Sequence, residues 1–247
     1  MDKSLYISMA GAKEAMDGQR LRANNLANVS TVGFKADFHQ YRSMAVFGEH
    51  HPTRVYAMGE RPGTDTSAGI LMETNRDLDI AIKNQGWFAV QMPDGSEAYT
   101  RAGDLKRDVS GLVTTGTGLP VLGDGGPLVL PEYEQLIVGV DGTLSVRGLG
   151  EDPLAVTPID RLKLVNPDPR NMVKGEDGLF HLREGGGLIE SDPNVQVVNG
   201  MLEGSNVNAV GEMAAVISQA RMFELNVKMM KTAQETDEAS ARIMQGG

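Results

Sequence analysis

The sequence predicts an α+β protein, in which long N- and C-terminal helices pair to form a stalk and the middle of the chain is an all-β domain, a sandwich or an irregular barrel. Two observations lead to this class. Apolar residues repeat at helical spacing near both ends, whereas all 11 prolines lie between Pro52 and Pro193 and 23 of the 30 glycines lie in 48–202. Proline is excluded from helix interiors and tolerated in turns and edge strands, so the middle should be rich in turns.

This pattern sets the expected domain boundaries. We expect an N-terminal assembly helix in 1–35, an extended linker in 36–68 and a β domain in 69–200. A C-terminal assembly helix in 201–247 should then pack with 1–35.

The N-terminal helix is predicted from residues 4–30, where apolar side chains follow a 3–4 spacing over about three heptads. One heptad position holds Leu5, Ala12 and Leu26, and another holds Met9, Met16 and Ala23. A cleaved signal peptide is the alternative for this stretch. It is disfavoured because Lys13 and Glu14 follow the short apolar run and the heptad continues through the supposed cleavage point.

The C-terminal helix is predicted from a second 3–4 stripe, which thins after Ala233 into a polar, frayed tail. The stripe consists of Met213, Val216, Ala220, Phe223, Val227 and Met230. Both stripes are rich in Met and Ala, so the helix pair alone should bury little apolar surface and be only marginally stable in water. We expect further neighbours, most simply identical subunits in a head-to-tail assembly, and helices that stay disordered until those neighbours arrive.

The β domain is predicted from short apolar runs separated by turn signals. Residues 86–103 form a hairpin with a Pro-Asp-Gly turn, and residues 135–148 form another with Asp141-Gly142 at the turn. Further strands are expected at 69–73, 78–82, 112–115, 119–122, 128–130, 159–165, 179–182 and 195–198. No long helix is expected between 50 and 200.

Composition excludes several classes of protein. The chain of 247 residues has no cysteine, so thiol nucleophiles, disulfides and zinc–thiolate sites are ruled out. Its formal net charge of −10 lies in the middle of the chain and argues against a nucleic-acid binder. No window holds the roughly 18–20 apolar residues that a membrane helix requires.

A search for catalytic or metal-binding residues finds only weak candidates. His50 and His51 are adjacent on a loop, where their side chains diverge, and His39 and His181 are isolated. We interpret all four as polar surface residues.

Two further features are better explained by structure than by catalysis. Asp77 and Asp79 alternate along a strand, as a glycosidase pair could, but a turn and a solvated strand start explain them equally well. Trp87 is interpreted as a core aromatic of the first hairpin. We therefore predict no enzyme activity and no cofactor or metal.

Four segments resemble one known family. "ANNLANVSTVGFKAD" (23–37) is similar to the N-terminal motif of the bacterial flagellar rod and hook family, and "TNRDLDIAIKNQGWFAVQ" (74–91) to its central segment. "YTRAGDLKRDVSGLVTTGTGLPVLG" (99–123) resembles the next stretch, and "LEGSNVNAVGEMAAVISQARMFELNVKMMK" (202–231) the C-terminal motif. The family often has Gly at the position of Asn84 and Phe at that of Trp87. Within the family the chain is most like a proximal rod protein, with the distal rod protein as the alternative.

The resemblance implies a structural subunit of the flagellar basal-body rod, which polymerises through its terminal helices and transmits torque for motility. It implies a place in the periplasm, reached by type III export without cleavage of a signal peptide. The implied partners are copies of the chain, other proximal and distal rod subunits, the export apparatus transiently, and surrounding ring proteins. Two other classes are alternatives: the small number of aromatic residues opposes a secreted β-rich adhesin, and the missing catalytic constellations oppose a hydrolase.

The amides of the N-terminal motif raise a specific hypothesis. Asn24, Asn25 and Asn28, with Asn206 and Asn208 at the other helix start, are expected to hydrogen-bond between helices or across subunits. Buried amides specify register because a misaligned neighbour leaves each unsatisfied, at a cost of about 1–3 kcal/mol. The alternative is that they only cap helices and form turns.

Gly33 is expected to give the sharp exit from the helix toward the β domain. The predicted subunit-interface residues are the two stripes and the five amides: Leu5, Met9, Met16, Ala23, Asn24, Asn25, Leu26, Asn28, Asn206, Asn208, Met213, Val216, Ala220, Phe223, Val227 and Met230.

Overall fold

The computed structural model describes residues 3–45, 55–150, 152, 155–183 and 189–245. The chain divides into two units, which are described separately. Unit 1 consists of Met1–Asn28, Asp37–Thr64 and Val207–Gly247, and unit 2 of Val29–Ala36 and Asp65–Asn206.

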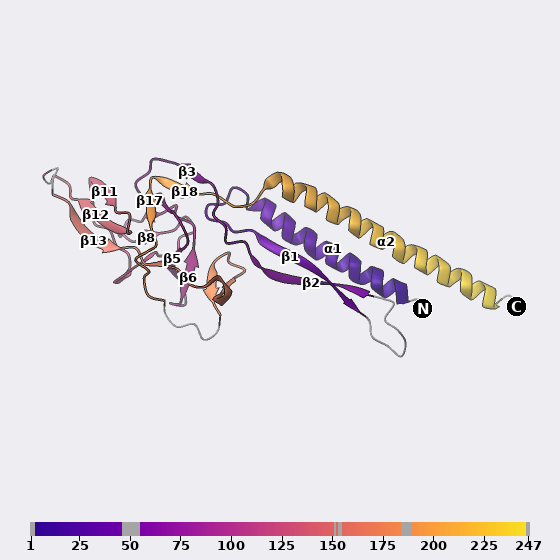
Figure 1. The fold of residues 1–247 in the computed structure, drawn as a ribbon. Helices are drawn as coiled ribbons and strands as arrows, with labels where there is room; N and C mark the ends of the chain where they lie inside the picture. The colour runs from indigo at the N-terminus through magenta and orange to yellow at the C-terminus, as the bar shows by residue number, and fades with distance from the viewer. Residues whose placement is uncertain (1–2, 46–54, 151, 153–154, 184–188, 246–247) are drawn as a thin grey trace. The chain divides into compact units, whose positions relative to one another are not determined.

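Unit 1 contains both long helices and one hairpin. Its elements are α1 (Lys3–Ala27), β1 (Asp37–Ala45), β2 (Val55–Thr64) and α2 (Ala209–Gln245). The helices lie side by side and antiparallel, and β1 and β2 also contact α1 (Figure 1). Among the described residues of unit 1 the buried apolar ones are Ala12 and Ala15. The fully buried apolar side chains of this unit are therefore small.

Unit 2 contains the remaining strands and one short 3-10 helix. The strands are β3 (Leu71–Glu73), β4 (Ile80–Ile82), β5 (Trp87–Gln91), β6 (Glu97–Thr100), β7 (Lys106–Arg107), β8 (Val113–Thr114), β9 (Leu122–Gly123), β10 (Gly126–Pro127), β11 (Gln135–Val138), β12 (Thr143–Arg147), β13 (Thr157–Arg161), β14 (Leu164–Val165), β15 (Met172–Lys174), β16 (Phe180–Leu182), β17 (Val197–Asn199) and β18 (Met201–Glu203). The 3-10 helix is η1 (Pro169–Asn171), with Asp168 as its N-cap.

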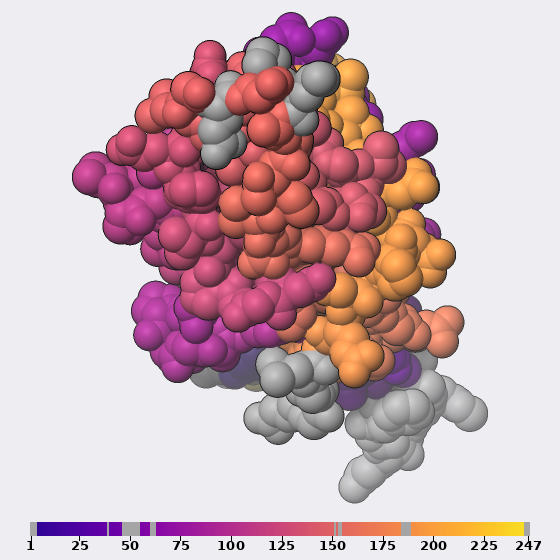
Figure 2. Space-filling view, turned by 90° about the vertical axis from the view of Figure 1, so that its left-hand side faces the viewer, coloured from indigo at the N-terminus to yellow at the C-terminus, as the bar shows by residue number. Residues whose placement is uncertain are grey.

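The strands of unit 2 form several small antiparallel sheets. The largest has the order β14-β5-β6-β16-β15, and a second is β11-β12-β13. The remaining pairs are β9–β10, β4–β17, β3–β18 and β7–β8. In Figure 2 the magenta to salmon stretch of the chain, which holds β5 to β13, forms one continuous surface of this unit.

Both predicted hairpins are confirmed. β5 pairs with β6, and β11 pairs with β12. At the first turn Asp94 Oδ1 accepts hydrogen bonds from the Ser96 backbone N (2.8 Å) and hydroxyl (2.6 Å). At the second turn Gly142 has φ +84°, a left-handed conformation that favours glycine.

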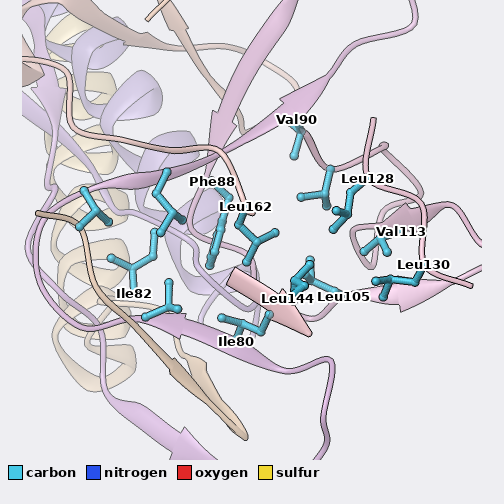
Figure 3. Packing of buried hydrophobic residues seen from close by; sticks show 14 of the residues in the cluster. Ile80, Ile82, Phe88, Val90, Leu105, Val113, Leu128, Leu130, Leu144 and Leu162 are labelled. Atoms are coloured by element: carbon cyan, nitrogen blue, oxygen red, sulfur yellow. The ribbon is translucent and has the colours of Figure 1, made fainter. Parts of the chain in front are cut away.

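The main core of unit 2 is a cluster of aliphatic side chains from many short strands and loops. Figure 3 shows Ile80, Phe88, Leu144 and Leu162 pointing into this common interior. A second cluster centres on Trp87, whose ring lies 4.2 Å from that of Phe180, centroid to centroid. Trp87 is 3% exposed, so its prediction as a core aromatic is confirmed.

The predicted α+β class is confirmed, and the finer description as a sandwich or barrel stays a prediction. The segment 36–68, expected as an extended linker, contains the hairpin β1–β2, with Asp37 opposite Thr64 and Ala45 opposite Val55. Residues 201–203 belong to β18, and α2 begins at Ala209. At the other end α2 continues to Gln245, through the tail that the thinning stripe indicated as frayed.

Some strands differ from the sequence expectation. The run 128–130 is not a strand but makes an isolated bridge between Val129 and Leu112. The short strands β7, β10, β15 and β18 were not predicted, because two- and three-residue strands show no measurable alternation. Between residues 55 and 206, η1 is the one helical element in the described chain. None of the described helices is both long and apolar enough to span a membrane.

The burial of Tyr99 in the second cluster can be tested through the pH dependence of stability. Its ring is 1% exposed and its hydroxyl donates to Glu97 Oε2 at 3.3 Å. Burial, together with the Glu97 charge, raises the pKa of Tyr99 to about 12. The folded state therefore holds the phenol proton more tightly than the unfolded chain, whose tyrosine pKa is about 10. This stabilisation is fully present below about pH 10 and is lost as the pH rises through 12.

We expect the free energy of unfolding of the parent chain to fall by about 1–3 kcal/mol more than that of Tyr99→Phe between pH 10 and 12. Urea titrations at several pH values, followed by Trp87 fluorescence, measure the difference. Parallel pH profiles for the two proteins would contradict the assignment.

Candidate assembly surface

Large apolar side chains on unit 1 are mostly exposed in the isolated chain. Those on α1 and the hairpin are Tyr6, Met9, Met16, Phe38, Tyr41, Met44, Val55 and Met58. Those on α2 are Val210, Met213, Ile217, Met222, Leu225, Val227, Met229, Ile243 and Met244. The fully buried apolar residues of the unit are alanines, whereas most of its larger apolar side chains are exposed and the others are half-buried. Exposed apolar surface on this scale marks an interaction site.

A groove between the helices forms part of this surface. It has a volume of about 420 Å³ and is lined on α1 by Ser4 and Ser8. On α2 it is lined by Leu225, Met229 and Ala233, among others. Leu225 and Met229 are 63% and 60% exposed, and Lys228, Thr232 and Thr236 also line the α2 wall, so this wall mixes apolar and polar side chains.

The predicted interface residues occupy three kinds of position. Met9, Met16, Ala23, Asn24, Asn208, Met213 and Val227 are exposed. Leu5, Leu26, Asn28, Asn206, Val216, Ala220, Phe223 and Met230 are half-buried, and Asn25 is fully buried. Their role as contacts between subunits stays a prediction, which the exposed methionines favour most.

Asn25 joins three elements of unit 1. Its Nδ2 donates to the Asp37 carbonyl at 3.0 Å and its Oδ1 accepts from the Asp37 N at 3.1 Å, so the side chain pairs with the first residue of β1 as another strand would. Nδ2 also lies 3.4 Å from Glu212 Oε1 on α2. Arg22 donates to the same Glu212 oxygen at 2.8 Å. This amide therefore links α1 to the hairpin and to α2.

The other amides make more local bonds. Asn28 Nδ2 donates to the Asn24 carbonyl within the helix end, and Asn208 caps α2 by accepting from the Gly211 N at 3.2 Å. Asn206, in unit 2, accepts from the Ala36 N at 2.8 Å and donates to the Asp65 carbonyl at 2.9 Å. Asn208 thus follows the capping interpretation, while Asn25 and Asn206 hold chain segments that are far apart in sequence.

Unit 2 contains a buried charge cluster that the sequence analysis missed. The Glu203 carboxylate, with no exposed side-chain surface, accepts from Lys35 Nζ at 2.5 Å through one oxygen and from Arg101 NH1 at 2.8 Å through the other. The Gly69 N donates to the first oxygen at 2.9 Å. Lys35 Nζ also donates to the Ser67 carbonyl at 2.6 Å. We call Lys35, Arg101 and Glu203 the buried charge cluster.

Neighbouring groups complete the cluster. Arg101 NH2 donates to the Asn84 carbonyl at 2.8 Å, and its guanidinium carbon lies 5.3 Å from the centre of the Trp87 ring. Burial lowers the pKa of Lys35 below the usual value for lysine, and the hydrogen bond and charge of Glu203 oppose that shift. Lys174 donates to the Lys35 carbonyl at 2.6 Å and lies over the Phe34 ring.

Gly33 allows the chain to approach this cluster. It has φ +67°, a left-handed conformation that favours glycine, and its N donates to the Glu203 carbonyl at 2.7 Å. Since α1 already ends at Ala27, the role of Gly33 in the exit from the helix stays a prediction. A Cβ at this position would lie 2.3 Å from the Ala102 N and from the Arg101 carbonyl carbon. Only glycine fits both constraints.

The candidates for catalysis or metal binding do not come together. His181 Nε2 lies 2.9 Å from Asp177 Oδ2, and Asp79 is buried beside Arg76 at 3.3 Å. His50 and His51, and the side chain of His39, lie outside the described part of the chain. Across the described residues, no three His, Asp or Glu side chains form a group that could hold a metal ion.

Comparison with known proteins identifies the family. A family model described as "Flagellar basal body rod FlgEFG protein C-terminal" matches residues 198–243, and one described as "Flagellar hook protein FlgE/F/G D1 domain" matches 81–146. The chain is 39% identical over 240 residues, 95% of each chain, to the flagellar basal-body rod protein FlgF of Escherichia coli (strain K12). This chain belongs to the flagellar basal-body rod protein family.

Other relatives agree. The FlgF protein of Salmonella typhimurium is 36% identical over 249 residues, 99% of each chain. The FlgG rod protein of Buchnera aphidicola subsp. Schizaphis graminum is 30% identical over 261 residues, covering 95% of this chain and 97% of that protein. Identity is higher to these two FlgF proteins than to this FlgG protein. The predicted family and the predicted role as a structural subunit of the basal-body rod are confirmed.

The four family-like segments supply the members and neighbours of the buried charge cluster. Lys35 comes from 23–37, Trp87 from 74–91, Arg101 from 99–123 and Glu203 from 202–231. Segments that lie far apart in the sequence thus meet around one carboxylate. The signal in the sequence was a charged residue close to a glycine in three of these segments. The sequence alone could not show that these charged residues pair with one another.

Replacing Glu203 tests the cluster. Glu203→Gln keeps the size of the side chain but leaves Lys35 and Arg101 buried without a counter-charge, so we expect the free energy of unfolding of unit 2 to fall by about 3–5 kcal/mol. Urea denaturation followed by Trp87 fluorescence measures the change. The matched control is Glu134→Gln, because the Glu134 side chain is 52% exposed and its ion pair with Arg147, at 3.6 Å, is longer than those of Glu203. We expect the control to cost less than about 1 kcal/mol. Equal losses in the two variants would contradict the role of the cluster.

Proposed function

We propose that the chain is a non-catalytic subunit that polymerises into the flagellar rod through unit 1. The observation that carries the proposal is the imbalance in unit 1, whose fully buried apolar residues are alanines while most of its large apolar side chains are exposed. A helix pair of this kind buries little surface by itself and is stabilised when neighbours cover it. The names of the relatives, which are basal-body rod proteins, support other rod subunits and copies of this chain as those neighbours.

The exposed stripes support contacts on more than one side. Met9 and Met16 repeat at seven residues along α1, so they form one exposed stripe. On α2, Val210, Met213 and Ile217 lie on one flank of the helix, whereas Leu225 and Met229 lie on the other. Different faces that bind different neighbours produce a heterologous, open assembly, as a shaft requires.

We further propose that the chain reaches the periplasmic rod by flagellar export with its N-terminal helix intact, transiently binding the export apparatus. Residues 10–12, the supposed cleavage point, lie inside α1, and Ala12 is buried there. Cleavage would remove part of the helix that α2 packs against. Unit 2 is proposed as the outward β domain, which could meet ring proteins, and the FlgF-like sequence supports a proximal position.

We also propose that the chain has no catalytic activity. The buried charges of unit 2 that could suggest chemistry bind one another and the backbone, as a structural cluster does. The membership of the chain among rod proteins supports the same conclusion.

Adding charge to the exposed methionine stripe tests polymerisation. Met9→Lys/Met16→Lys changes side chains that are 53% and 59% exposed, so the folded subunit should lose less than about 0.5 kcal/mol per site. Incorporation into isolated basal bodies should fall at least about tenfold, because each buried lysine costs at least ~1.4 kcal/mol of contact energy. Swimming motility should fall with it.

The matched control is Val109→Lys, a fully exposed apolar position in unit 2. It should incorporate and swim as the parent does. Normal incorporation of the α1 double variant would overturn the proposal that this stripe is covered in the rod.

A further inference from the structure

Polar side chains of α2 face α1 at a regular spacing. Asn226 Nδ2 donates to the Met222 carbonyl of its own helix at 2.9 Å, so its contact with Gly11 is one of close packing. On α2, Asn226, Gln219 and Glu212 are separated by seven residues each. On α1 the groups that they meet, Gly11, Gly18 and Asn25, are also separated by seven residues. Each step of seven along α1 is therefore matched by a step of seven back along α2. An α-helix returns nearly to the same face after seven residues, so the three contacts form one ladder.

Glycine makes room for the α2 amides in two of these layers. A Cβ at Gly11 would lie 2.8 Å from Asn226 Oδ1, and a Cβ at Gly18 would lie 3.4 Å from the Gln219 amide carbon. The Tyr41 hydroxyl of β1 also lies against Gly18, 2.2 Å from such a Cβ, and 3.4 Å from the Glu14 carbonyl. The second layer thus contains groups from α1, α2 and the hairpin.

The third layer is ionic. Glu212 is 8% exposed, and its Oε1 accepts from Arg22 at 2.8 Å and lies 3.4 Å from Asn25 Nδ2. Its Oε2 is buried and has no hydrogen-bond partner among the described atoms. A shift of α2 that moved Glu212 away from Arg22 and Asn25 would leave its carboxylate buried without any partner, which is energetically costly.

We propose that Asn226, Gln219 and Glu212 set the register of the α1–α2 pair, and so determine which apolar stripes each subunit presents to its neighbours. This inference deepens the proposed function and rests on it for its consequence in the rod, but the register itself is a property of the single chain.

The ladder opposes a shift of α2 along α1 both by one helical turn and by seven residues. A slip of one turn would place Asn226 against Ala15 or Ser8, whose side chains leave less room for the amide than Gly11 does. A slip of seven residues would keep the facing sides aligned but would remove Glu212 from Arg22 and Asn25. The apolar residues alone, mainly alanines at this seam, would resist such slips weakly.

The ladder also predicts the next facing pair. One further step of seven toward the N-terminus places Ser4 opposite Ala233, and both residues line the groove between the helices. Because the chain contains no cysteine, two engineered thiols report the register without interference. Ser4→Cys/Ala233→Cys reports the native register, and Ser4→Cys/Ser240→Cys reports a slip of seven residues.

The experiment compares disulfide yields under mild oxidation in purified subunits and in isolated basal bodies. In the parent background we expect the native pair to form at least about tenfold more disulfide than the slipped pair. Introducing Gln219→Leu/Asn226→Leu should bring the two yields within about threefold of each other, since two of the three polar layers become apolar. Ser218→Leu is the matched control, because it adds a leucine beside Gln219 at an exposed position of α2, and it should leave the tenfold preference intact.

Equal yields in the parent background would overturn the proposal without any variant having to fold. An unchanged preference in the Gln219→Leu/Asn226→Leu protein would also overturn it. The purified-subunit result does not depend on assembly, so a failure of rod incorporation alone would count against the proposed function and not against the register.

Discussion

A single buried carboxylate, that of Glu203, organises unit 2. It forms salt bridges with both Lys35 and Arg101 and accepts from the Gly69 backbone, while the main-chain carbonyl of Glu203 accepts from Gly33. Gly33 and Lys35 lie in the segment 29–36 and Arg101 in the middle of unit 2, whereas Glu203 lies close to its last residue, Asn206. Burying three charges is costly, and the cost is offset only while every partner is in place. The cluster therefore demands one arrangement of the segments that it joins.

The two units are stabilised in opposite ways. Unit 2 has a continuous aliphatic interior, in which residues such as Leu128 and Leu162 have no exposed surface. The fully buried residues of unit 1 are small or polar, and most of its large apolar side chains are exposed. The first arrangement suits a domain that folds by itself. The second suits an element completed by neighbours, and it explains why methionine and alanine dominate the terminal stripes.

The sequence was sufficient for the elements with strong local signals. Helical periodicity predicted α1 and α2, and turn residues such as Asp94 and Asp141 predicted the two main hairpins. The hairpin β1–β2 was missed, because its strands show no clean alternation and join through a long connection. Long-range polar pairing could not be predicted either. The sequence draws attention to Asn25 as one of several amides, but its partners Asp37 and Glu212 are defined only by the fold. Lys35 and Glu203 each lie close to a glycine, but they are 168 residues apart in the sequence, and nothing in their local pattern indicates that they pair.

Hydrogen exchange of the purified subunit and of isolated basal bodies tests the central claim, that unit 2 is complete alone whereas unit 1 is completed by neighbours. In the purified subunit we expect amides of β5 and β6 to be protected, and those of α1 and α2 to exchange at least about a hundredfold faster. In basal bodies the helices should become as protected as the strands. Helices that exchange as slowly as β5 in the purified subunit would contradict the account.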